Sequence, residues 1–160
     1  MLYAHRGVTG EADAYLRMNG MSRAHFRLLY MIALLPGITL RELVSTLEIT
    51  HQGISRILNQ LIADGYVRQE PDRADRRKRH LFLTDKGERI ERAVFDRQAA
   101  VITRAFEGIG KAGVAIFLEA MDAMVSDSDR AIVDELRRSA EGLDRTKQSS
   151  AGRSSKRRAS

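Results

Sequence analysis

The chain contains no cysteine and no tryptophan, and only two of its 160 residues are proline. Without cysteine, disulfides, zinc sites built on thiolates and redox sensing through a thiol are all excluded. The few prolines, together with frequent alanine, leucine, isoleucine, arginine and glutamate, predict a mostly helical chain of ordinary globular composition.

Long apolar runs are also missing. No stretch approaches the ~20 apolar residues that span a bilayer, and the N-terminus lacks the basic-then-apolar pattern of a secretion signal. The length suits one domain with a core, or a small domain with added oligomerisation elements. We therefore expect a soluble cytoplasmic protein with no membrane partner.

The net charge of +6 is concentrated at one end. From Leu143 onward the chain holds six cations and one anion, which leaves 21 cations and 20 anions before it. Residues 143–160 have no apolar periodicity and are rich in serine, arginine and lysine, so we expect a disordered basic tail. It either touches phosphates non-specifically or is a dispensable solvated segment. The net charge of the whole chain is therefore weak evidence about what the residues before Leu143 bind. Local clusters of charge are better evidence.

Two short helices are predicted between residues 39 and 64. Thr39 and Glu42 have the spacing of a capping box. Glu48-Ile49 gives a short turn, and Thr50 can cap a second helix that runs to Ala63. Gly65 can end that helix in the left-handed conformation. The apolar residues that recur at helical spacing are Leu40, Leu43, Val44 and Leu47 in the first helix and Ile54, Ile57, Leu58, Leu61 and Ile62 in the second.

The opposite face of the second helix is polar without being acidic. No carboxylate appears before Asp64, although surface helices commonly mix both signs. Its side chains can hydrogen-bond base edges or phosphates, and the amides behind the Thr50 cap can face a phosphate. A solvated helix surface is the alternative. The candidate contacts are Thr50, His51, Gln52, Ser55, Arg56 and Asn59.

A basic β-hairpin is predicted next. Residues 66–68 begin a strand, residues 80–83 supply its partner, and residues 72–79 between them hold five cations and two carboxylates. A charge run is often only a solvated loop, but this one follows the two helices at the distance that a wing requires. Such a tip attracts phosphates and suits a narrow, electronegative minor groove. The predicted fold is mainly α, a winged helix-turn-helix of three helices plus a hairpin, which places a helix in the DNA major groove.

The run ADGYVRQEPDRADRRKRHLFLTDKG resembles the signature of the MarR family of winged-helix regulators. The matching pieces are Gly65, Asp75-Arg76-Arg77, and Leu83-Thr84 followed by Gly87, and the resemblance covers roughly residues 15 to 140. It implies an obligate homodimer on pseudo-palindromic double-stranded DNA, often a repressor that a small ligand releases. It also implies that Asp75 orients Arg77, which enters the minor groove. Phosphate contacts would come from Arg73, Arg76, Lys78 and Arg79.

Helices are predicted on both sides of this region. Residues 1 to 18 read as a helix weakened by Gly7 and Gly10, and the resemblance places it in the dimer interface. Asn19-Gly20 breaks the chain. Ser22 caps a helix through Leu35, and Pro36-Gly37 ends it. Its expected buried side consists of Phe26, Leu29, Tyr30 and Ala33.

After Thr84 a long helix is expected to about Gly108, and a last helix from about Ala112 to Gly142. Residues 126–130 should form a bend or exposed turn within the last one. The apolar surface of these two helices is larger than the winged domain can bury. We therefore expect a second copy of the chain to bury the rest through two-fold pairing. A monomeric helical fold is the alternative. The domains are then 1–20 (N-terminal helix, dimerisation), 21–84 (winged helix-turn-helix), 85–142 (C-terminal dimerisation helices) and 143–160 (tail).

The resemblance further implies a ligand pocket between the winged domain and the dimerisation helices. Its candidate lining is Tyr15, Met18, Phe26 and Tyr30, residues that equally suit a plain core.

No catalytic site is expected. The four histidines are dispersed without metal-ligand spacing, the serines lack a nucleophile-elbow context, and Gly108-x-Gly110 lacks the rest of a nucleotide fingerprint. We expect no enzyme, no cofactor and no metal. The leading hypothesis is a homodimeric, sequence-specific transcriptional regulator. A non-specific architectural DNA-binding protein and a winged-helix protein-interaction adaptor are its rivals.

Overall fold

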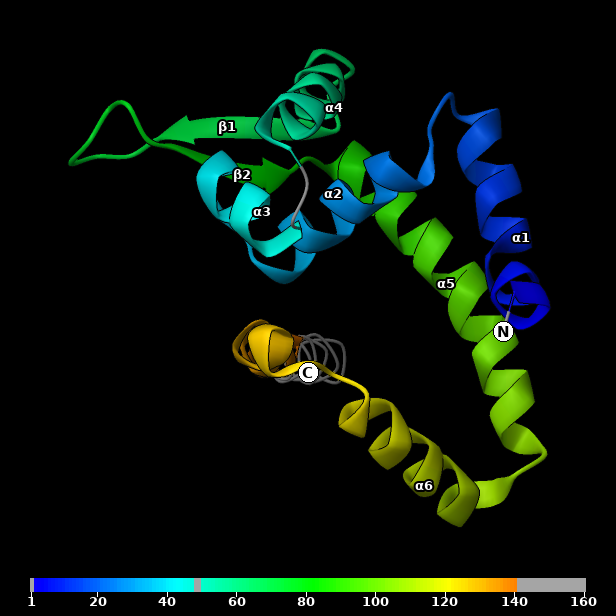
Figure 1. Cartoon of the computed structure of the whole chain (residues 1–160). Coiled ribbons are helices and arrows are strands. Elements are labelled where there is room, and N and C mark those ends of the chain that lie inside the picture. The colour runs from blue at the N-terminus through cyan, green and yellow to red at the C-terminus, as the bar shows by residue number, and fades with distance from the viewer. Residues whose placement is uncertain (1, 48–49, 141–160) are drawn as a thin grey trace, which may run out of the picture. The chain divides into compact units, whose positions relative to one another are not determined.

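The computed structural model describes residues 2–47 and 50–140 of the chain. The chain divides into two compact units, Met1–Met124 and Val125–Ser160. The elements of the first unit are α1 (Leu2–Met18), α2 (Arg23–Leu34), α3 (Leu40–Leu47), α4 (His51–Ala63), β1 (Val67–Pro71), β2 (Arg79–Leu83), α5 (Asp85–Glu107) and α6 (Gly110–Ala123) (Figure 1). The prediction of a mainly helical fold with one antiparallel hairpin is confirmed.

Side-chain caps fix the starts of the short helices. At α3 the Thr39 N–H donates to Glu42 Oε2 over 2.7 Å, and the Glu42 N–H donates to Thr39 Oγ1 over 3.3 Å, which is the predicted capping box. At α4 the Thr50 hydroxyl oxygen accepts from the Gly53 N–H over 3.4 Å. The predicted turn at Glu48-Ile49 lies outside the described residues.

The end of α4 is tied to the start of α5. Gly65 has a φ of +73°, so α4 ends at a left-handed glycine as predicted. The Tyr66 N–H donates back to the Leu61 carbonyl over 2.8 Å, which completes a Schellman motif. The Thr84 hydroxyl, which caps α5, donates to the Gly65 carbonyl over 2.7 Å. Lys86 Nζ donates to the Asp64 carbonyl over 2.8 Å. Residues on both sides of the hairpin therefore hold α4 in place.

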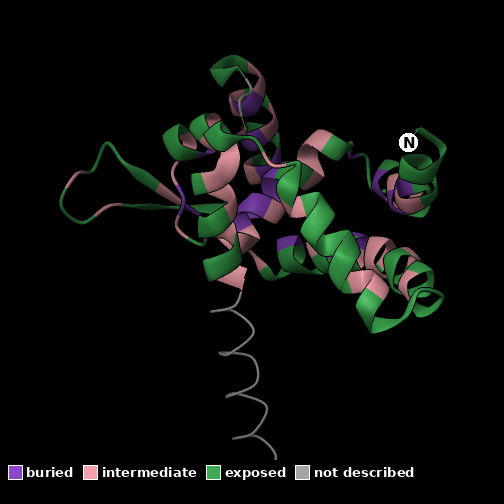
Figure 2. Ribbon diagram, turned by 60° about the horizontal axis from the view of Figure 1, so that its bottom comes forward, coloured by how far each residue is buried: buried purple, intermediate pink, exposed green. Residues whose placement is uncertain are grey.

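The core lies between α2, α3, α4, α5 and β2, and Figure 2 shows its buried residues gathered inside the helical body. The prediction for α2 was only partly right. Leu29 is buried, but Phe26, Tyr30 and Ala33 are only half-buried. The Tyr30 ring instead stacks on Phe95 of α5, with ring centroids 6.4 Å apart, at the rim of the core. The residues that α2 buries with Leu29 are Leu28, Met31 and Ile32.

Helix α1 is continuous through Gly7 and Gly10 and packs along α5. Its Ala12 and Leu16 are buried. Arg23 at the start of α2 forms an ion pair with Asp13, which lowers the pKa of that carboxyl. The same guanidinium donates to Thr9 Oγ1 over 2.8 Å, so one arginine links α1 to α2.

The last helix was predicted from Ala112 to Gly142 with a bend or exposed turn over residues 126–130, and the structure places the interruption slightly earlier. Helix α6 begins at Gly110 and ends at Ala123, and the described part of the second unit is helical over residues 127–140. Only residues 124–126 are non-helical. The Ser126 hydroxyl accepts from the Asp129 N–H over 3.3 Å and donates to the Asp129 carboxylate over 2.6 Å. Asp127 and Asp129 therefore stand in the first turn of a capped helix rather than in an exposed turn. Residues 141 and 142 lie outside the described part.

Candidate nucleic-acid interface

The polar face of α4 points to solvent because the opposite, apolar face of the helix is buried in the core. Ile54, Leu58 and Leu61 are at most 1% exposed, and their burial turns the residues between them outward. The exposed residues on this face are His51, Gln52, Arg56, Asn59 and Gln60.

The predicted contacts on α4 are not equally free. The Ser55 hydroxyl donates to the His51 carbonyl over 2.7 Å and lies 3.2 Å from His51 Nδ1, so it is turned onto its own helix. Gln52, Arg56 and Asn59 have no side-chain hydrogen bond or ion pair within residues 2–47 and 50–140. These three side chains are available to a partner without breaking a bond.

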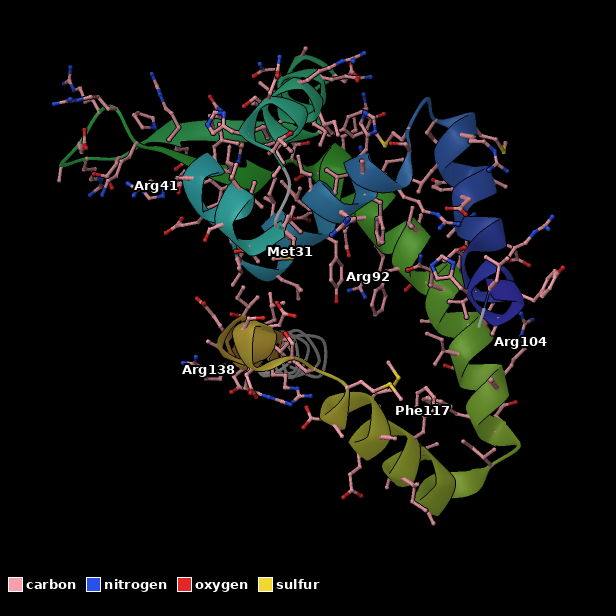
Figure 3. The ribbon with its side chains drawn as sticks, viewed as in Figure 1. Met31, Arg41, Arg92, Arg104, Phe117 and Arg138 are labelled. Atoms are coloured by element: carbon pink, nitrogen blue, oxygen red, sulfur yellow. The ribbon has the colours of Figure 1, made fainter. Side chains whose placement is uncertain are left out.

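The hairpin register places a compact basic loop beyond the helices. Val67 pairs with Leu83 and Pro71 pairs with Arg79, so residues 72–78 form the loop that projects from the body (Figure 1). Figure 3 shows nitrogen-tipped side chains spreading outward from it. Throughout the described part of the chain, no carboxylate forms a salt bridge with the exposed cations Arg73, Arg76, Lys78 and Arg79.

At the tip of the loop Asp75 fixes the backbone of Arg77. The Arg77 N–H donates to Asp75 Oδ1 over 3.0 Å, while its guanidinium Nε stays 3.9 Å from the same oxygen. The Arg77 side chain is 97% exposed. The carboxylate thus holds the main chain directly and the guanidinium only loosely, and insertion of Arg77 into a minor groove stays a prediction.

Sequence reasoning missed the residues at the base of the loop. His80 Nε2 lies 2.9 Å from Asp72 Oδ2, and His80 Nδ1 lies 2.7 Å from the Gly37 carbonyl oxygen. The hydrogen bond from His80, with those from the Asp75 and Ala74 N–H groups, lowers the pKa of Asp72 to about 2. The hydrogen bonds to Asp72 and then to Gly37 raise the pKa of His80. An aspartate and a histidine at the two ends of a predicted hairpin loop were the available signal.

The candidate ligand-pocket residues fall into separate places. Phe26 and Tyr30 lie with ring centroids 5.9 Å apart in the aromatic cluster that includes Phe95. Tyr15 of α1 lies under the Arg97 guanidinium, 4.0 Å from its ring centroid. Met18, at the end of α1, is 85% exposed. The structure therefore groups two of the four candidates, and α5 adds Phe95 to them.

Two further features bear on function. Within residues 2–47 and 50–140, no group of three or more histidines and carboxylates is placed to hold a metal ion. In the same part of the chain, every helix is too short or too polar to cross a membrane.

Comparisons with known proteins give a consistent pattern. The model of the MarR family matches residues 19–78. The HTH-type transcriptional regulator PetP of Rhodobacter capsulatus is 37% identical over 130 residues, which cover 81% of this chain and 78% of that protein. The transcriptional regulator Tm0710 of Thermotoga maritima has a TM-score of 0.56 at 29% identity over 73% of this chain and 82% of its own. Streptococcus pneumoniae FabT in complex with DNA shares the fold, with a TM-score of 0.68 at 22% identity over 77% of this chain and 88% of its own.

Proposed function

The chain belongs to the MarR family, and from that premise we propose that it is a cytoplasmic, homodimeric repressor of transcription that binds pseudo-palindromic DNA. Membership confirms the resemblance seen in the residues around Asp75-Arg76-Arg77. Since members of this family are transcriptional regulators, it also confirms that the chain is not an enzyme.

The proposal rests on two exposed surfaces that follow one another in the chain, the polar face of α4 and the basic end of the hairpin. Within the described residues, the face of α4 offers Gln52, Arg56 and Asn59 unbonded, and residues 73–79 of the hairpin offer five exposed cations. In this proposal α4 lies in the major groove, and the loop reaches the adjacent minor groove with Arg77 at its tip. The remaining loop cations neutralise phosphates and make affinity depend steeply on salt.

A second copy of the chain is the proposed cover for the apolar surface of α5 and α6. No residue of α6 is buried, although Phe117 packs edge-on against Phe106 of α5 at 5.5 Å and anchors α6 to it (Figure 3). Exposed apolar surface of this extent marks an interface. A two-fold axis would set the two α4 helices on half-sites about 34 Å apart. The apolar residues concerned are Ile102, Ile109, Ile116, Phe117, Leu118, Met121 and Met124, all 39–68% exposed.

Release by a small molecule is the remaining part of the proposal. The half-buried rings of Phe26 and Tyr30, with Phe95, are the surface we assign to it. A ligand there lies between α2 of the winged domain and α5. It would change DNA affinity only if it binds the DNA-free arrangement more tightly than the DNA-bound one.

Selection of binding sites from random duplex DNA tests the proposal against its rivals. The full chain and a version ending at residue 142 are used in parallel, so that the basic tail is judged separately. Enrichment of a palindromic motif by both supports the proposal. Salt-dependent binding with a flat profile identifies an architectural protein instead, and the absence of DNA binding identifies a protein-interaction adaptor.

A further inference from the structure

Both ring nitrogens of His80 on β2 face hydrogen-bond acceptors. Its Nδ1 faces the Gly37 carbonyl at 2.7 Å, and its Nε2 faces the Asp72 carboxylate at 2.9 Å. A carbonyl oxygen has no proton to donate, and a carboxyl whose pKa is about 2 is ionised at neutral pH. Both contacts can be hydrogen bonds at once only when both ring nitrogens donate, that is, when the side chain is an imidazolium.

The two acceptors belong to different parts of the DNA-binding unit. Gly37 lies in the turn between α2 and α3, with a φ of +90° that only glycine adopts readily. That turn also pairs with β2, since the Gly37 N–H donates to the Leu81 carbonyl over 2.8 Å. Asp72 opens the loop, and its other oxygen accepts the N–H groups of Ala74 and Asp75, each over 2.8 Å. The imidazolium therefore joins the helix-turn-helix to the loop.

The charged groups around His80 favour the protonated form. Glu42 of α3, bonded to Thr39, attracts the imidazolium, and Thr39 is the bridge partner of His80. Glu70 is opposite His80 on β1 and is paired with Arg68. Lys78 is the cation in this group and interacts with Glu42. The hydrogen bond to Asp72 and then the one to the Gly37 carbonyl raise the pKa of His80, and the charges of Asp72 and Glu42 raise it further.

We propose that His80 positions the loop of residues 72–78 for DNA. The second proton on its ring lets it bond Gly37 and Asp72 at once, which holds the loop against the helix-turn-helix in the position that contacts DNA. Loss of that proton sets a ring lone pair against either the Gly37 carbonyl or the Asp72 carboxylate. One of the two links then opens, and the loop loses its anchor. This inference rests on the proposed function.

The direction of the pH effect follows from the raised pKa of His80. A group with a raised folded-state pKa contributes fully below its ordinary value of 6.5 and loses its contribution as pH rises through the folded value. Operator affinity should therefore fall as pH rises through the raised pKa of His80.

The first test needs no DNA. Nitrogen chemical shifts of His80 are followed by NMR against pH in the full chain and in Asp72→Asn. We expect two protonated ring nitrogens at neutral pH in the wild type, and a lower pKa in the variant. A neutral His80 ring in the wild type at neutral pH overturns the inference, whatever the protein does with DNA.

The second test uses a synthetic duplex that carries the motif enriched from random DNA. Fluorescence anisotropy gives the affinity between about pH 6 and about pH 9, a range that begins below the ordinary histidine pKa and extends above it. As pH rises over this range, we expect the DNA affinity of the wild type to fall about 2- to 10-fold, the equivalent of one net hydrogen bond. The control His5→Gln, at an exposed position of α1, should show the same fall. His80→Gln should bind more weakly at low pH and show a flat profile.

The inference is overturned if the DNA affinity of His80→Gln depends on pH as that of the wild type does. It is also overturned by a flat profile in His51→Gln, since the exposed histidine of α4 would then be the titrating group. Failure to enrich any motif would instead contradict the proposed function, and the NMR titration would still decide the link through His80.

Discussion

Gly87 of α5 lies directly against the backbone of Tyr66, so that a Cβ at position 87 would stand 2.2 Å from the Tyr66 carbonyl oxygen. It would also lie 3.4 Å from the Leu83 Cβ. The Tyr66 carbonyl cannot retreat, because it accepts the Thr84 N–H over 3.0 Å. The closeness of α5 to the end of α4 therefore depends on the absence of a side chain at this one position.

We predict that Gly87→Ala destabilises the protein by about 1–3 kcal/mol, the usual cost of overpacking. Urea unfolding followed by circular dichroism measures it. Gly10→Ala on α1 is the matched control, because a Cβ there meets nothing within 4 Å. Replacing a helical glycine at an open position should add about 0.5–1 kcal/mol of stability. Equal effects of the two variants would show that the contact at Tyr66 is not constraining.

Arg77→Ala should lower operator affinity about tenfold, the equivalent of one hydrogen bond made by a charged group. The side chain is 97% exposed, so the substitution should leave the unfolding free energy nearly unchanged. A gel-shift titration measures the affinity. Arg92→Ala removes the same charge from an exposed position on α5 and should bind like the wild type. If Arg77→Ala binds the operator as tightly as the wild type, Arg77 at the tip of the loop does not contact DNA.

Arg56→Ala and Lys78→Ala should weaken binding in different ways. Loss of a bidentate base contact from Arg56 should cost about 1–3 kcal/mol and relax specificity at one position of the motif. Loss of a phosphate contact from Lys78 should weaken all sequences alike and lower the salt slope by about one unit. Affinities for the motif and its single-base variants, measured at several salt concentrations, separate the two. A uniform loss in both variants would mean that Arg56 contacts phosphate rather than a base.

If the chain forms the proposed homodimer, Leu118→Glu should convert it to a monomer. Leu118 is 56% exposed on α6 in a single chain, and a carboxylate buried between two copies would lack a partner. Light scattering coupled to size exclusion gives the mass. Glu119→Gln changes the neighbouring exposed residue without adding charge and should stay dimeric. Monomeric wild-type protein, or a dimer that tolerates Leu118→Glu, would contradict the proposed use of α6.

Much of the DNA-binding unit could be predicted because local signals define it. The Thr39–Glu42 box, the Thr50 cap and the left-handed Gly65 each involve atoms within a few residues of one another. Their geometry is therefore written in short stretches of sequence. The break after α6 had such a signal too, since Ser126 and Asp129 have capping-box spacing, but its two aspartates suggested an exposed turn.

The sequence by itself determined the order of helices and hairpin, the exposed polar face of α4 and the density of cations in the loop after β1, since each depends on neighbours in the chain. Only the tertiary structure decided that Tyr30 stacks on Phe95, that α5 touches Tyr66 at Gly87, and that His80 reaches Gly37. Gly37 and His80 are 43 residues apart, and a hydrogen bond over that separation follows from the packing of the turn against β2. No periodicity or spacing records such packing, because it arises only when separate elements come together.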